Sequence, residues 1–263
     1  MTKTSVKISH IGTATVVLGV AGVKFLTDPF FSPAVTKWDL GFAVVGNSDT
    51  PAIAIHDLPV IDAILLSHED HADNLDEPGR TLLNGRRVFT CMDGARKLHP
   101  RPGVQGLQPW EKVSVDISGK RFQITGTPCV HLPGGEVTGF ILTTPELGES
   151  NGLPNAIYFS GDTVYVKKLT QMRHKFQISV AILSIGATTV QLPGSEPLKV
   201  TMCGKEASQL FREIGADILV PMHCESWGHF LKKGNKLREA FKEEGIADKV
   251  QWLEPGALTV FDI

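Results

Sequence analysis

A dense group of histidine and acidic side chains lies in one short segment of the chain. Residues Ser67–Asn74 read SHEDHADN and directly follow the mostly apolar run Ile61–Leu66. Imidazole and carboxylate groups are the ligands that Zn²⁺ and related divalent ions use in proteins. A turn can direct alternate side chains towards one point, so this loop alone could serve two ions.

Three further candidate ligands each follow an apolar or β-rich run: His131 after Thr125–Val130, Asp162 after Ala156–Ser160, and His223 after Ile218–Met222. Each has an ordinary explanation when taken singly. A histidine at a strand end is usually hydrogen-bonded, and Asp162, like Asp73, could cap a helix or a turn. Four such elements in order favour a metal site at one sheet edge.

The elements that would position these residues are short strands interleaved with helices. We predict strands at Val6–Ile8, Thr15–Leu18, Val23–Thr27, Ile61–Leu66, Arg87–Thr90, Val113–Ile117, Arg121–Thr127, Val137–Thr143, Ala156–Phe159, Val180–Ser184, Ile218–Val220, Val250–Leu253 and Leu258–Phe261. We predict helices from Asp73 or Asn74 to about Leu83, at Asp93–Leu98 and Val164–Arg173, from Thr201 or Gly204 to Ile214, and at Asn235–Glu244. The absence of a strict βαβ alternation indicates an α/β (α+β) protein with two sheets covered by outer helices.

Several motifs resemble those of the metallo-β-lactamase fold superfamily, in the branch that includes bacterial ascorbate-6-phosphate lactonase. They are the opening HIGTAT of His10–Thr15, the acidic motif Thr27-Asp28-Pro29, the loop Ser67–Asn74, and then His131, Asp162 and His223 in order. The resemblance covers essentially the whole chain. It implies one domain over residues 1–263, a four-layer αβ/βα sandwich of two mixed β-sheets with outer helices.

The resemblance also implies a ligand set: His68, His71 and His131 at a first site, Asp162 bridging two ions, and Asp73 with His223 at a second site. The family loop reads H-x-H-x-D-H, and this chain departs from it. We favour His68 and His71 as the two histidines, with one residue inserted between them. The alternative register uses Glu69 and His71. In either register Asn74 stands where a histidine is expected, which weakens the second site.

By the same resemblance, Zn²⁺ is the expected cofactor, as one or two ions, and Mn²⁺ is the alternative. A bound ion generates hydroxide at neutral pH, and Asp73 would orient this nucleophile and move its proton. From their place in the segment after His223, Glu225, Trp227 and His229 would line the substrate pocket, with His229 donating a proton to the leaving group; the alternative is a packed loop with a surface histidine. Asp28 would either support a ligand histidine or form a turn. The expected activity is opening of a small cyclic ester or amide. The alternatives are a metal-dependent phosphodiesterase and a non-catalytic metal-binding protein.

Composition limits the partners and the compartment. The chain has 263 residues, 42% of them hydrophobic, and a formal net charge of -2, so it is neither disordered nor strongly basic. We therefore expect a small-molecule substrate, with no nucleic acid and no membrane as partner. Four unpaired cysteines and no apolar leader favour a cytoplasmic protein with reduced thiols. The oligomeric state is left open.

Overall fold

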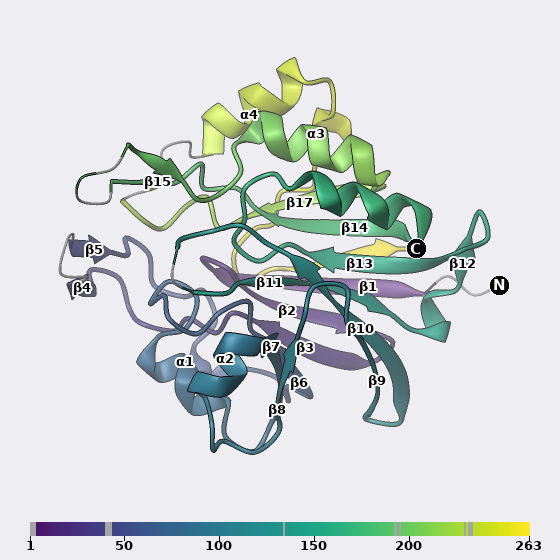
Figure 1. Cartoon of the computed structure of the whole chain (residues 1–263), viewed down its shortest axis with the longest axis horizontal. Helices are drawn as coiled ribbons and strands as arrows, with labels where there is room; N and C mark the ends of the chain where they lie inside the picture. Colours follow the sequence, from purple (N-terminus) through teal and green to yellow (C-terminus); the bar gives the residue numbers. More distant parts are fainter. Residues whose placement is uncertain are drawn as a thin grey trace.

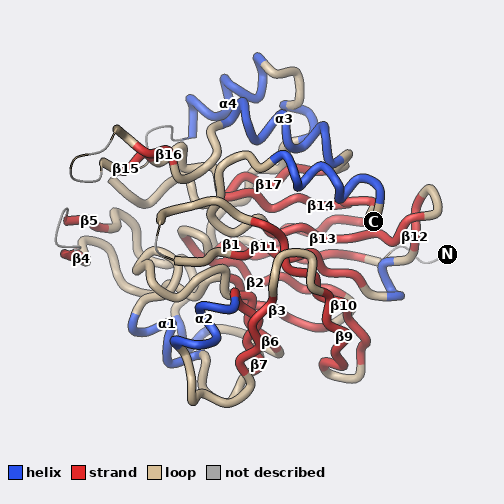
Figure 2. The backbone as a smooth tube through the Cα atoms, viewed as in Figure 1, coloured by secondary structure: helices blue, strands red, loops and turns tan. Residues whose placement is uncertain are grey.

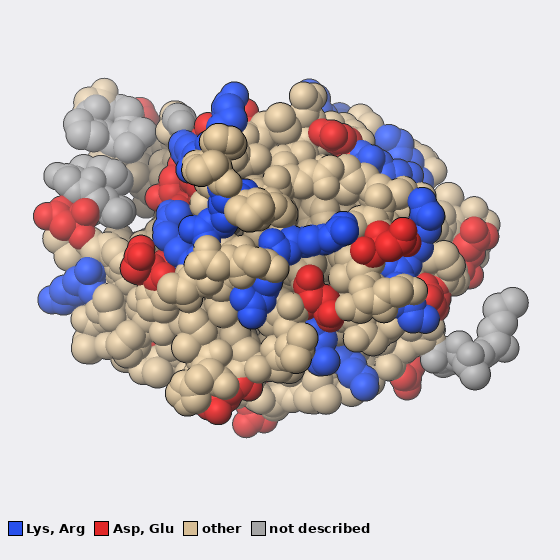
Figure 3. Space-filling model, turned by 90° about the horizontal axis from the view of Figure 1, so that it is seen from below, with Lys and Arg blue, Asp and Glu red and all other residues tan. Residues whose placement is uncertain are grey.

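Two facing β-sheets form the centre of the molecule, with helices on both outer faces (Figure 1). The computed structural model describes residues 4–39, 44–133, 135–191, 194, 196–228, 230 and 234–263. Among these residues, no helix combines the length and the apolar character needed to cross a bilayer. On the face seen in Figure 3, Lys and Arg side chains lie among Asp and Glu side chains, as the small net charge would suggest.

The first sheet is mixed and has the strand order β18-β1-β2-β3-β6-β7-β8. Its strands are β1 (Ser5–Gly12), β2 (Thr15–Val20), β3 (Val23–Thr27), β6 (Ala63–Leu65), β7 (Arg87–Cys91), β8 (Val104–Leu107) and β18 (Leu258–Asp262). Strands β3 and β6 are parallel and in register at Thr27 and Leu65. Their carboxyl ends therefore lie at one edge, which brings Asp28 next to Ser67.

The second sheet is also mixed, with the order β17-β14-β13-β11-β10-β9 and the short β12 beside β13. Its strands are β9 (Lys112–Ile117), β10 (Lys120–Pro128), β11 (Thr138–Thr143), β12 (Glu149–Ser150), β13 (Leu153–Phe159), β14 (Gln177–Ser184) and β17 (Ile218–Met222). Strands β13, β14 and β17 are parallel. The loops that carry Asp162 and His223 consequently leave the sheet at the same edge.

Apolar side chains from both sheets meet in the central core. Phe25 of β3 packs edge-on against Phe122 of β10, with ring centroids 5.1 Å apart. Strand β14 is buried along almost its whole length, as expected for an apolar strand covered on both faces. Burial of such side chains stabilises the fold by roughly 1.5–3 kcal/mol each.

The helices form the two outer layers (Figure 2). The elements outside the sheets are α1 (Glu77–Leu82), α2 (Met92–Lys97), α3 (Gly204–Ile214), α4 (Gly234–Glu243), and the 3₁₀ segments η1 (Ile55–Asp57), η2 (Pro145–Leu147), η3 (Lys167–His174) and η4 (Ala247–Lys249). Helix α3 places Ala207, Leu210 and Ile214 in the apolar cluster against the second sheet. It ends at Gly215, whose φ of 68° is easily reached by glycine. The predicted four-layer arrangement of two mixed sheets is confirmed.

Two short hairpins extend from the same side of the molecule, at the left of Figure 1. One pairs β4 (Lys37–Asp39) with β5 (Val44–Gly46), and the other pairs β15 (Thr189–Val190) with β16 (Leu198–Lys199). None of these four strands is among the strands predicted from the sequence. The hairpins matter because each contributes side chains to the pocket described below.

Three predicted elements differ from the structure. The helix expected from Asp73 or Asn74 begins only at Glu77, because Asp76 is the cap and accepts a hydrogen bond from the Gly79 amide at 2.7 Å. The helix expected at Val164–Arg173 is the 3₁₀ segment η3. The strand expected at Val250–Leu253 is reduced to a single bridge between Leu219 and Val250.

Candidate metal centre

Three histidines from two loops, His68, His71 and His131 (the triad), converge on one point. One nitrogen from each ring lies within 4.8 Å of the other two, an arrangement that could hold a metal ion. His68 Nε2 lies 3.0 Å from His71 Nδ1, and His131 Nε2 lies 3.3 Å from the same atom. His68 and His71 come from the loop after β6, and His131 follows β10 in the opposite sheet. The structure thus brings the three predicted ligands of the first site together.

Hydrogen bonds on the far side of two rings fix their tautomers. The Ser67 hydroxyl donates to Asp28 Oδ2 at 2.8 Å, so its oxygen must accept from Nδ1–H of His68, also at 2.8 Å. Nδ1–H of His131 donates to the Val200 carbonyl at 2.7 Å. Both Nε2 atoms therefore turn lone pairs towards Nδ1 of His71, which carries at most one hydrogen.

A cation fits this cluster of lone pairs. Tetrahedral Zn²⁺ with Zn–N bonds of about 2.0–2.1 Å separates its ligand nitrogens by about 3.3 Å, close to the observed spacings. Burial, followed by the neighbouring charge of His71, lowers the pKa of His68 to about 3. Burial likewise lowers the pKa of His131. Neutral imidazoles are the form that binds metal.

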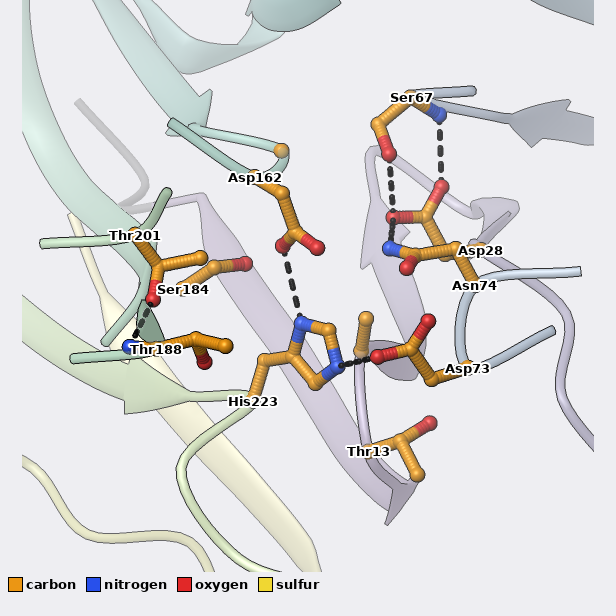
Figure 4. Close-up of polar contacts among 12 residues, drawn as sticks. Thr13, Asp28, Ser67, Asp73, Asn74, Asp162, Ser184, Thr188, Thr201 and His223 are labelled. Atoms are coloured by element: carbon orange, nitrogen blue, oxygen red, sulfur yellow. Dashed lines mark hydrogen bonds and ion pairs between the residues drawn. The ribbon is translucent and has the colours of Figure 1, made fainter. Parts of the chain in front are cut away.

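A second set of side chains, Asp162, His223 and Asp73, forms a row beside the triad and is called the row below. Nδ1 of His223 donates to Asp162 Oδ1 at 2.9 Å, and its Nε2 lies 3.4 Å from Asp73 Oδ2. Figure 4 shows the ring lying between these two carboxylates. Burial alone would lower the pKa of His223, but the charge of Asp162 and the contacts with both carboxylates raise it to about 10. The positive charge of His223 in turn holds the pKa of Asp162 well below its usual range, despite burial.

The turn that presents His223 has an uncommon backbone conformation. His223 has a φ of 53° and Thr13, which faces it from the end of β1, has a φ of 47°. The His223 amide donates to the Thr13 carbonyl at 3.2 Å, and Nε2–H of His10 donates to the same carbonyl at 3.2 Å. Left-handed residues other than glycine are costly and concentrate at functional sites. His10 therefore supports the His223 turn from behind.

Asn74 does not face the row. Its side-chain amide donates to Asp28 Oδ2 at 3.0 Å, and Figure 4 shows the amide nitrogen directed at that carboxylate. Asp28 also accepts the Ser67 amide at 2.6 Å, so this buried carboxylate ties both ends of the loop together. Burial raises the pKa of Asp28 to about 7, against the hydrogen bonds that favour its charged form.

The register of the loop follows from Glu69. Its carboxylate is almost fully buried and pairs with Lys97 at 2.9 Å, on the side of the loop that faces α2. The His68 ring lies on the other side of the loop, with its nitrogen near those of His71 and His131. The geometry thus favours the register with His68 and His71 over the alternative with Glu69.

A cavity of about 280 Å³ opens above the triad and the row. Its floor includes His71, Asp73, His131, Asp162 and His223. Its walls are largely apolar or hydroxyl-bearing: Val45, Leu132, Val190, Val200, Phe230, Thr188, Thr189 and Thr201. Phe230 stands edge-on to the ring of His223, with centroids 5.0 Å apart. The five predicted ligands that line this cavity come from both sheets.

Other predicted residues lie elsewhere. Trp227 is fully buried, with its ring 5.4 Å from that of Phe30, and does not line the cavity above the triad. Glu225 and His10 line a separate cavity of about 340 Å³ on the other side of the His223 turn. The predicted proton donor His229 lies outside the described residues. Cys129 and Cys224 are thiols whose pKa values burial raises to about 12.

Sequence reasoning missed several residues that shape the site. Ser67 was seen only as a strand end, yet it links Asp28 to His68. Thr188 lines the cavity, and its buried hydroxyl has no hydrogen-bond partner within the described part of the chain. The presence of Ser67 next to His68, together with the acidic motif at Asp28, could have suggested the contact of Ser67 with both residues. Nothing in the spacing of Thr188 or Phe230 could have suggested theirs.

Comparison with known proteins places these features in context. The family model described as the beta-lactamase superfamily domain matches residues 24–224. An uncharacterized protein of Mycobacterium tuberculosis is 29% identical over 238 residues, which cover 85% of this chain. The chain spans only 59% of the length of that relative. A UPF0173 metal-dependent hydrolase of Methanopyrus kandleri is 23% identical over 262 residues, covering 95% of this chain and 97% of the relative.

Solved structures show the same fold. Igni18, a metallo hydrolase from Ignicoccus hospitalis, superposes with a TM-score of 0.74 at 20% identity, over 98% of this chain and 99% of its own. The isothiocyanate hydrolase from Delia radicum gut bacteria gives a TM-score of 0.78 at 23% identity, over 98% and 100%. At such identities the likeness concerns the fold. The branch that includes ascorbate-6-phosphate lactonase stays a prediction.

Proposed function

The chain belongs to the beta-lactamase superfamily, and from that membership we propose that it is a metal-dependent hydrolase of small, uncharged cyclic esters or amides. The observation that supports this most directly is the cavity above the histidine triad. Its small volume, about 280 Å³, suits a substrate of modest size. Its largely apolar walls favour an uncharged body over a phosphorylated one.

The charges around the cavity favour a neutral substrate. Among the described residues, neither Lys nor Arg lines it, and Asp73 and Asp162 are both acidic. A phosphate ester would need cationic groups to offset its charge, as in Arg or Lys clamps. The phosphodiesterase alternative would therefore depend on the bound ion and His223 alone, without a Lys or Arg clamp in this part of the chain.

The chain's own groups can bind and orient such a substrate. Phe230 and Val190 offer it an apolar surface. Asp73, whose side chain is 18% exposed, can accept a proton at Oδ2 while His223 holds it in place.

The triad would hold the ion, and Zn²⁺ is the proposed metal with Mn²⁺ as the alternative. A bound divalent ion supplies an activated water and a Lewis acid at neutral pH. Asp162 would then lie between the triad and His223, where its negative charge offsets part of the ionic charge. We propose a cytoplasmic location and partners limited to small-molecule substrates.

A second candidate substrate class is an isothiocyanate, R–N=C=S. The observation that favours it is the apolar part of the same cavity wall, formed by Val45, Val190 and Phe230, because this group is uncharged and carries an electrophilic carbon. One of the solved structures of the same fold bears the name isothiocyanate hydrolase. Addition of water to that carbon and cleavage of the C–N bond would yield an amine and carbonyl sulfide.

The test is a substrate panel with the purified, Zn²⁺-loaded protein. Simple lactones, lactams, an alkyl isothiocyanate and a neutral carboxylic ester are compared with bis(p-nitrophenyl) phosphate. We expect turnover of at least one uncharged substrate and little of the phosphodiester. Turnover of the phosphodiester alone would contradict the proposal.

Variants connect the turnover to the site. His131→Ala and Asp162→Ala should each abolish activity, whereas His174→Ala, at an exposed position in η3, should keep it. Unchanged turnover in both site variants would overturn the proposal. Stoichiometric metal without turnover of any panel member would favour the non-catalytic alternative.

A further inference from the structure

We propose that Lys97 is a positioning residue that sets the metal affinity of the triad, although it lies outside the cavity. The inference rests on the proposed function, because it assumes that the triad holds a metal ion. Lys97 ends α2, and its ammonium group lies 2.9 Å from Glu69 Oε1, 3.3 Å from Asp70 Oδ2 and 2.8 Å from Asp93 Oδ2. Two of these three partners separate the ligands His68 and His71 in sequence.

The Glu69 carboxylate makes this contact more than a surface ion pair. Its side chain is only 5% exposed, whereas Lys97 is 44% exposed. The other carboxylate oxygen, Oε2, is buried and has no hydrogen-bond partner within the described residues. A buried carboxylate needs a countercharge, because desolvation otherwise disfavours its charged form. Lys97 supplies that charge.

The loop is held at its backbone as well. The Arg80 guanidinium of α1 donates to the Glu69 carbonyl oxygen. Asp28 accepts from the Ser67 amide and from the Asn74 side chain at the two ends. Between these anchors, Lys97 is the cation that the structure places on the side chains of Glu69 and Asp70. The direction of both intervening side chains therefore depends on it.

The consequence for the triad is geometric. Glu69 directly follows His68, and a residue with a free carboxylate beside a cation site would compete to bind the ion. The pair with Lys97 keeps this carboxylate on the α2 side of the loop, so that His68 presents its Nε2 to the cluster. Lys97 in this way selects His68 over Glu69 as the ligand. Groups that orient ligands in this indirect manner typically change metal affinity by about 10–100-fold when removed.

A matched pair of variants on one helix tests the inference. Lys97→Met removes the ammonium group and keeps the length of the side chain. Arg96→Met removes the neighbouring cation, which contacts Asp93 at 3.0 Å and Glu136 at 4.0 Å but neither Glu69 nor Asp70. We expect Zn²⁺ affinity, measured by chelator competition, to fall about 10–100-fold in Lys97→Met and to stay at the wild-type value in Arg96→Met. The visible spectrum of the Co²⁺-loaded protein should change only in Lys97→Met.

Two further variants separate positioning from folding. Lys97→Arg keeps the charge and should restore most of the affinity. Glu69→Gln combined with Lys97→Met removes both charges, so it should bind Zn²⁺ more tightly than Lys97→Met alone. If Lys97→Met does not fold, Lys97→Gln, which also removes the charge but stays polar, takes its place in both comparisons. A merely structural role would lower the melting temperature of the metal-free protein and leave the affinity of the folded protein unchanged.

The outcomes distinguish this inference from the proposed function. If the wild-type protein binds no divalent ion, the proposed function fails and takes the inference with it. If the wild type binds Zn²⁺ and Lys97→Met matches it in affinity and Co²⁺ spectrum, the inference alone is overturned. It is also overturned if the double variant binds Zn²⁺ no better than Lys97→Met does.

Discussion

The triad and the row meet in one cavity, but they balance their charges in opposite ways. In the triad, one nitrogen of each imidazole faces a common point, and the lowered pKa of His68, about 3, keeps that ring uncharged. In the row, His223 lies between Asp162 and Asp73, and its raised pKa, about 10, keeps it charged. The triad therefore requires a cation from outside, whereas the row already contains one.

This difference concerns more than the number of ligands. The two sets lie at the edges of facing sheets and share similar residue types, yet their hydrogen bonds assign them different roles. Backbone and hydroxyl acceptors behind His68 and His131 free their Nε2 atoms for a metal. Both nitrogens of His223 instead face carboxylates. The contacts behind each ring determine whether it serves as a ligand or as a charge partner.

The largest expected effect compares the loss of one ring from each set. His71→Ala should weaken Zn²⁺ binding by more than about 100-fold, beyond the loss typical of a supporting residue, because it removes a ligand nitrogen. His223→Gln should keep the tightly bound ion, since the triad remains intact. Metal content after dialysis, measured by mass spectrometry, checks both. Equal loss of metal in the two variants would break the distinction between the sets.

The number of ions sharpens the same comparison. A second ion in the row would have to displace His223 from Asp73 or Asp162, and Asn74 is engaged with Asp28. If breaking one such pair costs about 1.4 kcal/mol, the affinity for the second ion falls about tenfold. We therefore expect one tight Zn²⁺ per chain in a calorimetric titration and a second that binds at least about tenfold more weakly. Two ions of equal affinity would contradict this.

The pH dependence of the metal-free protein tests the charge of the row. Folded His223 keeps its proton up to about pH 10, but the unfolded residue loses it near 6.5. Between these values the folded state holds the extra proton, so this contribution is complete below pH 6.5 and is lost as the pH rises towards 10. The free energy of unfolding should fall by at most about 1.4 kcal/mol per pH unit.

Urea unfolding of the chelator-treated protein at pH 7 and 9.5 provides the measurement. The slope should be shallower in His223→Gln and unchanged in His174→Gln, at an exposed histidine that makes no contact with the row. Identical pH slopes in wild type and His223→Gln would mean that His223 is not charged in the folded protein.

Much of the site could be predicted because its residues follow strands. A polar residue directly after an apolar strand lies at the sheet edge, and parallel strands bring such edges together. This reasoning placed His131, Asp162 and His223 near the loop Ser67–Asn74. The layers were predictable for a related reason, since the continuous apolar run of β14 indicates a strand covered on both faces and the helical spacing of apolar residues indicates α3.

The contacts that separate the two sets could not be predicted. Whether Asn74 turns to Asp28 or to His223 depends on distances of an ångström or two between loops, which spacing in the sequence does not specify. The same holds for Lys97, whose position at the end of α2 gives no sign of Glu69. The start of α1 was misplaced for this reason too, because Asp76 uses its other oxygen to accept the Phe31 amide.

The hydroxyl oxygen of Ser67 lies behind the triad and orients His68. Removing this one atom gives the smallest expected effect. The hydroxyl donates to Asp28 and accepts from His68, so Ser67→Ala leaves a buried carboxylate with one donor fewer and frees the His68 tautomer. We expect the free energy of unfolding to fall by about 1–2 kcal/mol and Zn²⁺ affinity to fall by about tenfold. The control is Ser114→Ala at an exposed position in β9, where both quantities should stay unchanged. A loss of stability with full metal affinity would show that Ser67 supports the fold but does not orient His68.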